Sequence, residues 1–369
     1  MKAVVFERFG DPAEVLQVRE VPEAEPGPGQ VRVRMLASPI GPADFLTVRG
    51  EYGHRPKLPA TPGTEGVGIV EAGRGLLGRI RVGRRVAVLN ETGGNWQEKV
   101  VVSALRVVPI SKHVPDDQAA TFFINPAAAF IMTRLVLKVP PRAWLLQTAA
   151  GSTFGRMVIR LGRHFGFRTI NVVRRREEAE ELLRAGGDAA IASESESIED
   201  RVRALTDGEG VSFALDAVGG KTGSAVARSL ARGGRLLVFG TLAEEPLSLP
   251  SRMLFVGVKR IDGFWLSDWV RRQNVWTMIR LFRRIHELMA KGVLSTDIGP
   301  VFPLDDIRAA VRQASMPGRN GKVLLKMSSA SCGCRKATAR GLASISRRRS
   351  IPSSTTTFIT RTPERFSHG

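Results

Sequence analysis

The sequence predicts an α/β fold in which a β-rich domain is followed by a doubly wound parallel-sheet domain. Three observations support this prediction. Short apolar runs separated by glycines fill roughly the first 120 residues, as in a small β-barrel. From about residue 125, strand-like runs alternate with longer helical patterns. Within this second region, residues 144–176 have the pattern strand, turn, helix, strand, which is the unit that binds a dinucleotide.

The unit at residues 144–176 divides at clear changes of pattern. Residues 144–147 are apolar enough for a buried strand, small residues at 148–152 predict a turn, and 169–173 form a β-branched run. Between the two strands, four apolar residues at helical spacing define one face of a helix: Phe154, Val158, Leu161 and Phe165. We expect the turn and the helix N-terminus to receive a pyrophosphate.

The glycine signature of this turn is degenerate. Gly151 and Gly155 are present, but Thr153 lies between them where a glycine is common. A pattern of this kind is also typical of any tight turn between a strand and a helix. The residues after the second strand are more informative. Three arginines, Arg174, Arg175 and Arg176, begin 19 residues after Gly155.

An NAD site usually has an acid at this place, whereas cations suit the 2′-phosphate of NADP. The alternative is that the three arginines form the solvated start of the next helix and pair with Glu177, Glu178 and Glu180. The context of the strand–turn–helix unit favours the phosphate.

The other elements follow in chain order. Residues 31–35 alternate apolar and polar, as in a half-buried strand, after a Pro/Gly turn at 26–29. Later patterns predict a helix at 178–184, strands at 189–192, 211–217 and 236–239, a helix at 275–289 and a last strand at 322–326. In an open α/β sheet, the ligand binds at the carboxyl ends of the strands.

Composition limits the classes of function. The chain has 369 residues and a net charge of +20, of which +7 belongs to the Ser/Thr-rich segment 328–369, predicted to be a disordered basic tail. The remaining arginines are scattered among acids, and one tyrosine with no aromatic–basic interleaving does not favour nucleic-acid binding. The only cysteines, Cys332 and Cys334, lie in the tail, which suits a reducing cytoplasm. We expect neither a membrane span nor a leader peptide.

Five stretches of the chain carry a resemblance to a known family: residues 38–44 (SPIGPAD), 62–68 (PGTEGVG), 125–126 (NP), 169–174 (TINVVR) and 263–269 (GFWLSDW). The chain resembles the zinc-independent medium-chain dehydrogenase/reductase superfamily and, within it, the mitochondrial-type 2-enoyl thioester reductases. The resemblance covers residues 1–327. It implies a GroES-like β-barrel catalytic domain at 1–120, a Rossmann NADP-binding domain at 121–270, and a return to the catalytic domain at 271–327.

The resemblance also implies the cofactor contacts for NADPH. Asn125 precedes the first Rossmann helix, and Arg174 to Arg176 hold the 2′-phosphate. The remaining contacts belong to the pyrophosphate turn, the nicotinamide region and the edge of the pocket: Gly151, Ser152, Thr153 and Phe154; Phe239, Gly240, Thr241 and Leu242; Phe264, Trp265, Leu266 and Lys322. Three residues depart from the family pattern, since Thr153 replaces a glycine, Phe154 a small aliphatic residue and Arg175 an aspartate.

No metal site is expected. Zinc-dependent relatives carry a catalytic cysteine, a histidine beside a glutamate, and a lobe with four cysteines. Here Thr64 stands before Glu65 where that histidine would be, and residues 1–327 contain no cysteine. Zinc needs N or S ligands at fixed spacing.

Tyr52, the only tyrosine, occupies the position that matches the family's catalytic tyrosine. Reduction of an enoyl thioester moves a hydride to the β-carbon and a proton to the α-carbon, and a phenol can relay that proton or stabilise the enolate oxygen. The alternative is a tyrosine that only packs at the rim. His54, two residues further on, is either a helper or an exposed loop residue.

The leading prediction is an NADPH-dependent reductase of trans-2-enoyl thioesters, carried on CoA or on acyl carrier protein, acting as a homodimer in the cytoplasm. The second is an NADPH:quinone oxidoreductase of the same superfamily. A third, from a different class, is a cofactor-binding protein with little catalysis.

Overall fold

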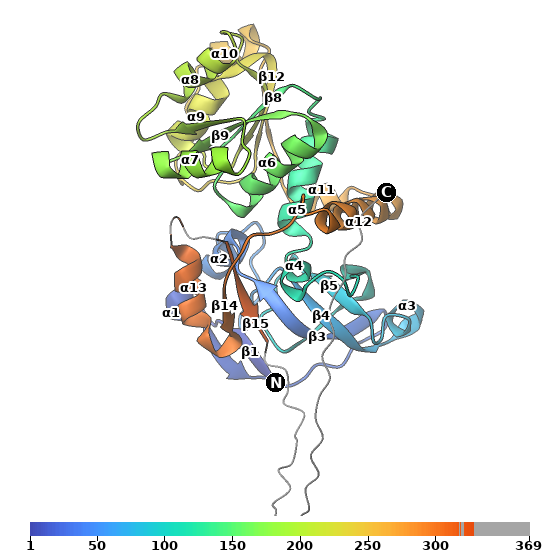
Figure 1. The fold of residues 1–369 in the computed structure, drawn as a ribbon. Coiled ribbons are helices and arrows are strands. Elements are labelled where there is room, and N and C mark those ends of the chain that lie inside the picture. The colour runs from blue at the N-terminus through green and yellow to red at the C-terminus, as the bar shows by residue number, and fades with distance from the viewer. Residues whose placement is uncertain (317, 319–320, 328–369) are drawn as a thin grey trace, which may run out of the picture. The chain divides into compact units, whose positions relative to one another are not determined.

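A computed structural model describes residues 1–316, 318 and 321–327, so the predicted basic tail at 328–369 lies outside the described residues. Two large sheets and a two-stranded one form the framework (Figure 1). The helices are α1 (Pro12–Val15), α2 (Pro42–Arg49), α3 (Gly75–Arg79), α4 (Asp116–Ala120), α5 (Ile124–Phe130), α6 (Thr153–Phe165), α7 (Arg176–Arg184), α8 (Ile198–Leu205), α9 (Gly220–Arg228), α10 (Ser251–Val256), α11 (Leu266–Arg271), α12 (Val275–Ala290) and α13 (Ile307–Ser315). A π-helix, η2 (Ile131–Val136), continues α5, and η1 (Ala104–Arg106) and η3 (Leu304–Asp306) are 3-10 turns.

The first large sheet contains the N-terminal strands and the last strands of the described chain. Its order is β14-β15-β3-β4-β5-β7, and β6 pairs with β3. The strands are β3 (Gln30–Pro39), β4 (Glu65–Gly73), β5 (Arg85–Leu89), β6 (Lys99–Ser103), β7 (Val107–Pro109), β14 (Ile298–Pro303) and β15 (Lys322–Lys326), while β1 (Lys2–Val5) and β2 (Gln17–Glu20) form the small sheet. The alternation expected at 31–35 is present, because Val31, Val33 and Met35 are buried.

The end of the described chain returns to this sheet. β15 pairs antiparallel with β3, with Leu324 opposite Pro39, and parallel with β14. Val323, Leu324 and Leu325 are buried, so the strand completes a core that begins with residues near the N-terminus. Residues from both ends of the sequence therefore share one hydrophobic core.

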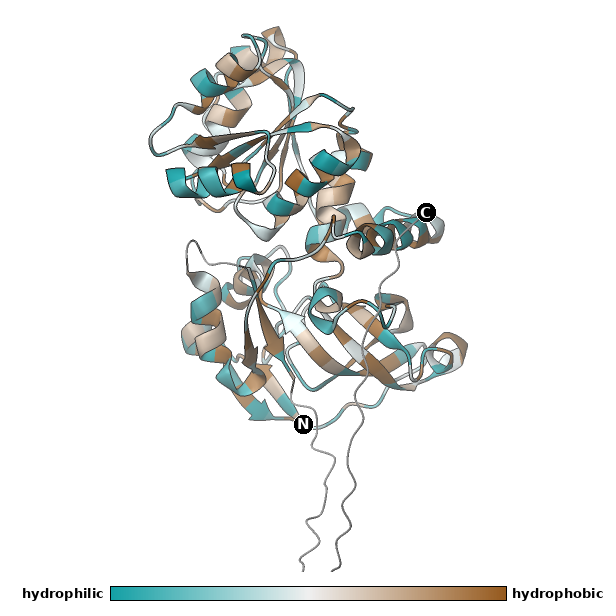
Figure 2. Cartoon of the chain, viewed as in Figure 1, coloured by the Kyte–Doolittle hydropathy of each residue, from teal (hydrophilic) through white to brown (hydrophobic). Residues whose placement is uncertain are grey.

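The second large sheet is parallel throughout, in the order β10-β9-β8-β11-β12-β13. Its strands are β8 (Trp144–Gln147), β9 (Arg168–Val173), β10 (Ala189–Ala192), β11 (Val211–Asp216), β12 (Leu230–Val238) and β13 (Arg260–Gly263). The strand order reverses between β8 and β11, which places a crevice outside their carboxyl ends. The strands are apolar and the helices beside them carry hydrophilic faces (Figure 2).

Several elements have the bounds that the sequence predicts, including β8, β10 and β15. Two differ. β12 begins at Leu230, six residues before the predicted start, because Gly233 at φ +73° lies in an irregular part of the strand and not in a turn between elements. Phe239 and Gly240 follow the strand instead of ending it. No helix of the described residues is long and apolar enough to cross a membrane.

Candidate active site

The turn between β8 and α6 has the geometry of an anion-binding turn. Ser152 caps α6, because its Oγ accepts a hydrogen bond from the Gly155 N–H at 3.1 Å, and Thr153 is the first residue of the helix. A Cβ on Gly155 would lie 2.4 Å from the Ala150 carbonyl oxygen, so helix and turn approach closely only because this residue is glycine. A Cβ on Gly151 would meet only a methyl of Val173, at 3.8 Å. Gly151 therefore leaves the backbone open toward the expected pyrophosphate.

Asp216, at the carboxyl end of β11, is hydrogen-bonded to the start of this turn. Its buried carboxylate accepts hydrogen bonds from Thr148 Oγ1 at 2.6 Å and from the N–H groups of Val218 and Gly219, each at 3.0 Å. The sequence analysis missed Asp216, although an acid ending an apolar strand at the ligand edge is a usable signal. The same carboxylate thus fixes two neighbouring turns of the crevice.

Arg156 holds the turn from the side and was also missed. Its Nε donates to the Gly151 carbonyl at 3.2 Å, and its Nη2 pairs with Glu181 of α7 at 2.7 Å. The Gly151 carbonyl is therefore held by a side chain of α6, within the same turn whose surroundings are open at Gly151.

The three arginines after β9 have different environments. Arg175 pairs with Glu178 at 2.5 Å and Arg176 with Glu180 at 3.4 Å. These two arginines therefore make the ion pairs expected if they form the solvated start of α7. Arg174 is exposed and, among the described residues, no ion pair is found for it. Arg174 follows β9 directly, at the carboxyl edge of the parallel sheet.

Phe154 departs from the family pattern and has a specific partner. Its ring packs against Phe239 with centroids 4.6 Å apart, and Phe154 is buried.

The loop that follows β12 lies close to the loop that follows β11. A Cβ on Gly240 would lie 2.7 Å from the Ala217 carbonyl oxygen, so this glycine permits close approach of the two loops. Thr241 and Leu242 are exposed, and the Leu242 N–H donates to the Ala217 carbonyl at 3.1 Å. Phe264 continues β13, and its N–H donates to Val238.

Tyr52 and Trp265 lie side by side although 213 residues separate them. Trp265 Nε1 donates to Tyr52 Oη at 3.3 Å, and the rings are edge to face, 6.1 Å between centroids and 85° between planes. A Cβ on Gly53 would lie 3.0 Å from the Trp265 ring, so the loop approaches the indole closely. Tyr52 and Trp265 line a hollow of about 180 Å³ with Gly53, His54, Glu91, Thr92, Ser267 and Arg271.

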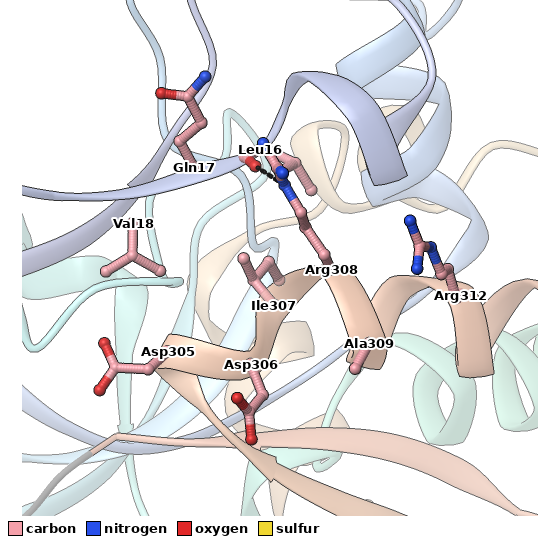
Figure 3. A pocket seen from close by; sticks show the side chains of 9 residues that line it. All are labelled: Leu16, Gln17, Val18, Asp305, Asp306, Ile307, Arg308, Ala309 and Arg312. Carbon is pink, nitrogen blue, oxygen red and sulfur yellow. Dashed lines mark hydrogen bonds between the residues drawn. The ribbon is translucent and has the colours of Figure 1, made fainter.

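A larger hollow, of about 570 Å³, lies between β2 and α13 (Figure 3). It is lined by Leu16, Gln17, Val18, Asp305, Asp306, Ile307, Arg308, Ala309 and Arg312, and Arg308 donates to the Leu16 carbonyl at 3.3 Å. None of the predicted site residues lines it, and it is more open than the hollow at Tyr52. Of these two hollows, the one at Tyr52 is therefore the one that predicted site residues line.

Two buried acids and a lysine form a charge cluster near the N-terminus of α5. Burial raises the pKa of Asp44 to about 6 and that of Glu65 to about 7, while hydrogen bonds and the charge of Lys322 oppose the rise. Glu65 Oε2 accepts from the N–H groups of Phe123 and Ile124 at 3.2 and 2.9 Å. Lys322 is itself buried, and Asn125 lies inside α5, one helix before the α6 turn.

The structure thus groups most predicted site residues into three sets. The turn residues Gly151 to Phe154 and Arg174 lie at the carboxyl ends of β8 and β9, with Phe239 against Phe154. Trp265, at the start of α11 beside Leu266, joins Tyr52. Lys322 and the helix of Asn125 meet at Glu65. Within the described residues, no group of three or more His, Cys, Asp or Glu side chains is arranged to hold a metal ion.

Comparisons with known proteins agree with this architecture. A family model described as the alcohol dehydrogenase GroES-like domain matches residues 27–112, and one described as zinc-binding dehydrogenase matches residues 154–284. Human mitochondrial enoyl-[acyl-carrier-protein] reductase is 31% identical over 332 residues, which cover 89% of this chain and 89% of that protein.

Among solved structures, a candidate NADPH:quinone reductase from Bacillus thuringiensis is 33% identical with a TM-score of 0.83, over 88% of this chain and 98% of that one. A quinone oxidoreductase from Pseudomonas syringae is 27% identical with a TM-score of 0.81, over 88% and 99%. The GroES-like part, the parallel dinucleotide-type sheet and the likeness along almost the whole described chain lead to one conclusion. The chain belongs to the zinc-independent medium-chain dehydrogenase/reductase superfamily and is an oxidoreductase.

Proposed function

We propose that this protein uses NADPH to reduce the double bond of trans-2-enoyl thioesters carried on CoA or acyl carrier protein. The observation that carries the proposal is the Tyr52–Trp265 pair, a hydrogen-bonded phenol and indole at the edge of a hollow. Bound NADPH supplies a hydride for the β-carbon. The likeness to the human enoyl reductase, along 89% of both chains, supports the same class of substrate.

The direction of the Tyr52–Trp265 hydrogen bond explains how Tyr52 would act. An indole N–H can only donate, so the Tyr52 oxygen is the acceptor and its own hydrogen remains available to another partner. When charge develops on the thioester oxygen, Tyr52 can donate to that enolate or pass a proton to the α-carbon. Donation from Trp265 stabilises negative charge on the Tyr52 oxygen, which makes the phenol a better donor.

The proposed cofactor contacts are those that the family resemblance implies. We propose that Gly151, Ser152, Thr153 and Phe154 hold the pyrophosphate, and that Arg174 contacts the 2′-phosphate, with Arg175 and Arg176 contributing only if they leave their glutamate partners. Phe239, Gly240, Thr241 and Leu242, together with Phe264, Leu266, Asn125 and Lys322, complete the proposed pocket. The net charge of +20 suits an anionic cofactor and an anionic acyl carrier.

We also propose a homodimer, with β13 as the contact edge. β13 is an edge strand of the parallel sheet, and exposed Leu254 and Phe255 on α10 lie close before it in sequence. Sedimentation of the purified protein would show twice the 40.2 kDa chain mass. A cytoplasmic location remains a prediction, since the enoyl reductase relatives are described as mitochondrial.

The second candidate is NADPH:quinone oxidoreduction, which the names of the Bacillus and Pseudomonas relatives favour. A quinone also accepts a hydride and a proton, and a phenol beside the hollow could serve either substrate. The two candidates differ in what Tyr52 must do. Only the enoyl thioester requires a proton at carbon after the hydride has arrived.

The test is steady-state kinetics of Tyr52→Phe and Trp265→Phe on crotonyl-CoA. We expect Tyr52→Phe to lower kcat about 10²-fold, because a lost donor to an oxyanion typically costs 10²–10³-fold and water can partly replace it. Trp265→Phe should lower kcat by less, since the phenol remains. His113→Gln, at an exposed histidine outside this hollow, is the control and should leave kcat unchanged. An unchanged kcat in Tyr52→Phe would mean that Tyr52 only packs at the rim of the hollow.

A further inference from the structure

Glu65 makes an uncommon long-range contact. Its side chain is 3% exposed, and Oε2 accepts two backbone hydrogen bonds, from Ile124 at 2.9 Å and Phe123 at 3.2 Å. Glu65 is the first residue of β4, whereas the two donors lie 58 and 59 residues later at the start of α5. A strand of one sheet thus fixes the beginning of a helix far along the chain.

The start of α5 depends on this carboxylate. Phe123, its N-cap residue, provides no side-chain hydrogen bond, and the first turn has no acid of its own. The first N–H groups of a helix need an outside acceptor, and a negative charge is favourable there. Since Phe123 is buried, water cannot easily take the place of Glu65.

The same carboxylate belongs to a cluster that includes Lys322. The charged groups around Glu65 are Asp44 from α2 and Lys322 from β15, both of which act on its pKa. Asp44 is held by Gly41 N–H at 2.8 Å and by Thr64. A Cβ on Gly41 would lie 3.0 Å from Lys322 Nζ and 3.4 Å from Asp44 Oδ2, so these charged ends converge at one point.

We propose that Glu65 is a positioning residue for the cofactor, which sets Asn125 through the start of α5 without contacting the cofactor itself. Asn125 follows Ile124 directly, so a shift of the helix start moves its side chain. This inference rests on the proposed NADPH contact of Asn125. It goes beyond that contact by naming the residue that holds Asn125 in place.

The experiment measures NADPH binding directly at pH 8, above the pKa of Glu65, by fluorescence titration of the full chain. Glu65→Ala should raise the Kd of NADPH about tenfold, the effect of losing one hydrogen-bonded charged group. Glu65→Gln keeps an acceptor oxygen for the two N–H groups and should stay within about threefold of wild type. Glu71→Gln, an exposed position on the same strand, is the matched control and should not change the Kd.

A double-mutant cycle separates positioning from general stability. If Glu65 acts through Asn125, then Glu65→Ala should add little to the loss caused by Asn125→Ala. Full additivity of the two losses would overturn the inference, as would a Gln variant that binds as weakly as the Ala variant. An Ala variant that binds like wild type would overturn it too.

Hydrogen exchange of the wild-type protein serves if Glu65→Ala does not fold. The amides of Phe123, Ile124 and Asn125 should become more protected when NADPH binds, and unchanged protection there would contradict the proposal. Because both readouts are binding measurements, they remain valid if the substrate proves to be a quinone. Failure of the proposed function would instead appear as wild-type protein that turns over no enoyl thioester.

Discussion

At the scale of single residues, the site depends on which partner each polar atom already has. Tyr52 Oη receives a hydrogen bond from Trp265, so its hydrogen is free for a substrate. Arg175 and Arg176 have carboxylate partners on their own helix, and Arg174 differs from them in this respect among the described residues. The number of available cations is therefore smaller than the run of three arginines suggests.

Arg174→Ala should weaken NADPH binding at least about tenfold and NADH binding little, because only NADPH carries the 2′-phosphate. Arg176→Ala is the matched control and should have a smaller effect, since its guanidinium already pairs with Glu180. Titration of both cofactors against both variants measures this. Equal losses for NADPH and NADH in Arg174→Ala would exclude the phosphate contact.

Glu65 should also make stability depend on pH. Burial raises its pKa from 4.5 to about 7, so the folded protein holds this proton more tightly than the unfolded chain. The stabilisation is complete below pH 4.5 and is lost as pH rises toward 7, in total roughly 3 kcal/mol. Urea unfolding across this range should show a smaller decline for Glu65→Gln than for wild type. Parallel curves would mean that Glu65 titrates normally.

At the scale of elements, the β8–α6 turn separates two uses of glycine. Gly155 serves packing, because a Cβ would lie 2.4 Å from backbone, while Gly151 serves access, because its surroundings are open. Ser152 supplies the helix cap, and we propose that the open surroundings of Gly151 admit the pyrophosphate.

Gly155→Ala should lower the free energy of unfolding by about 1–3 kcal/mol, the usual cost of overpacking. Gly151→Ala should leave stability nearly unchanged, because its Cβ meets only a Val173 methyl group at 3.8 Å. It should weaken NADPH binding if the pyrophosphate lies against this turn, as we propose. Thermal unfolding and cofactor titration of the two variants provide the comparison. If both variants lose only stability, the turn does not receive the cofactor.

The sequence predicted elements well where a local pattern determines them. β8, β10 and β15 have the predicted bounds, since each is a short apolar run with clear limits. It could not reveal the Tyr52–Trp265 hydrogen bond or the Glu65 contact with Ile124, which join residues far apart in sequence. It also misplaced the start of β12, because Gly233 and Gly234 have the pattern of a turn but lie within the strand. Contacts between residues that only the tertiary fold brings together leave no periodic pattern in the sequence.

At the scale of the whole molecule, the first sheet uses residues from both ends of the described chain, whereas the parallel sheet uses residues 144–263. Met327 is buried in the core that contains β15. Because residues 328–369 lack an apolar pattern able to bury a core, truncation after Met327 should leave the Tm and turnover unchanged. A drop in Tm of more than about 5 °C would show that residues 328–369 contribute to folding.

We propose that this oxidoreductase acts on enoyl thioesters with NADPH and uses the Tyr52 hydroxyl. The most direct test is to measure turnover of the wild-type protein with NADPH on crotonyl-CoA and on a simple quinone in parallel. We expect reduction of crotonyl-CoA that exceeds quinone reduction in kcat/KM and that falls about 10²-fold in Tyr52→Phe. Efficient quinone reduction without any enoyl reduction would contradict it.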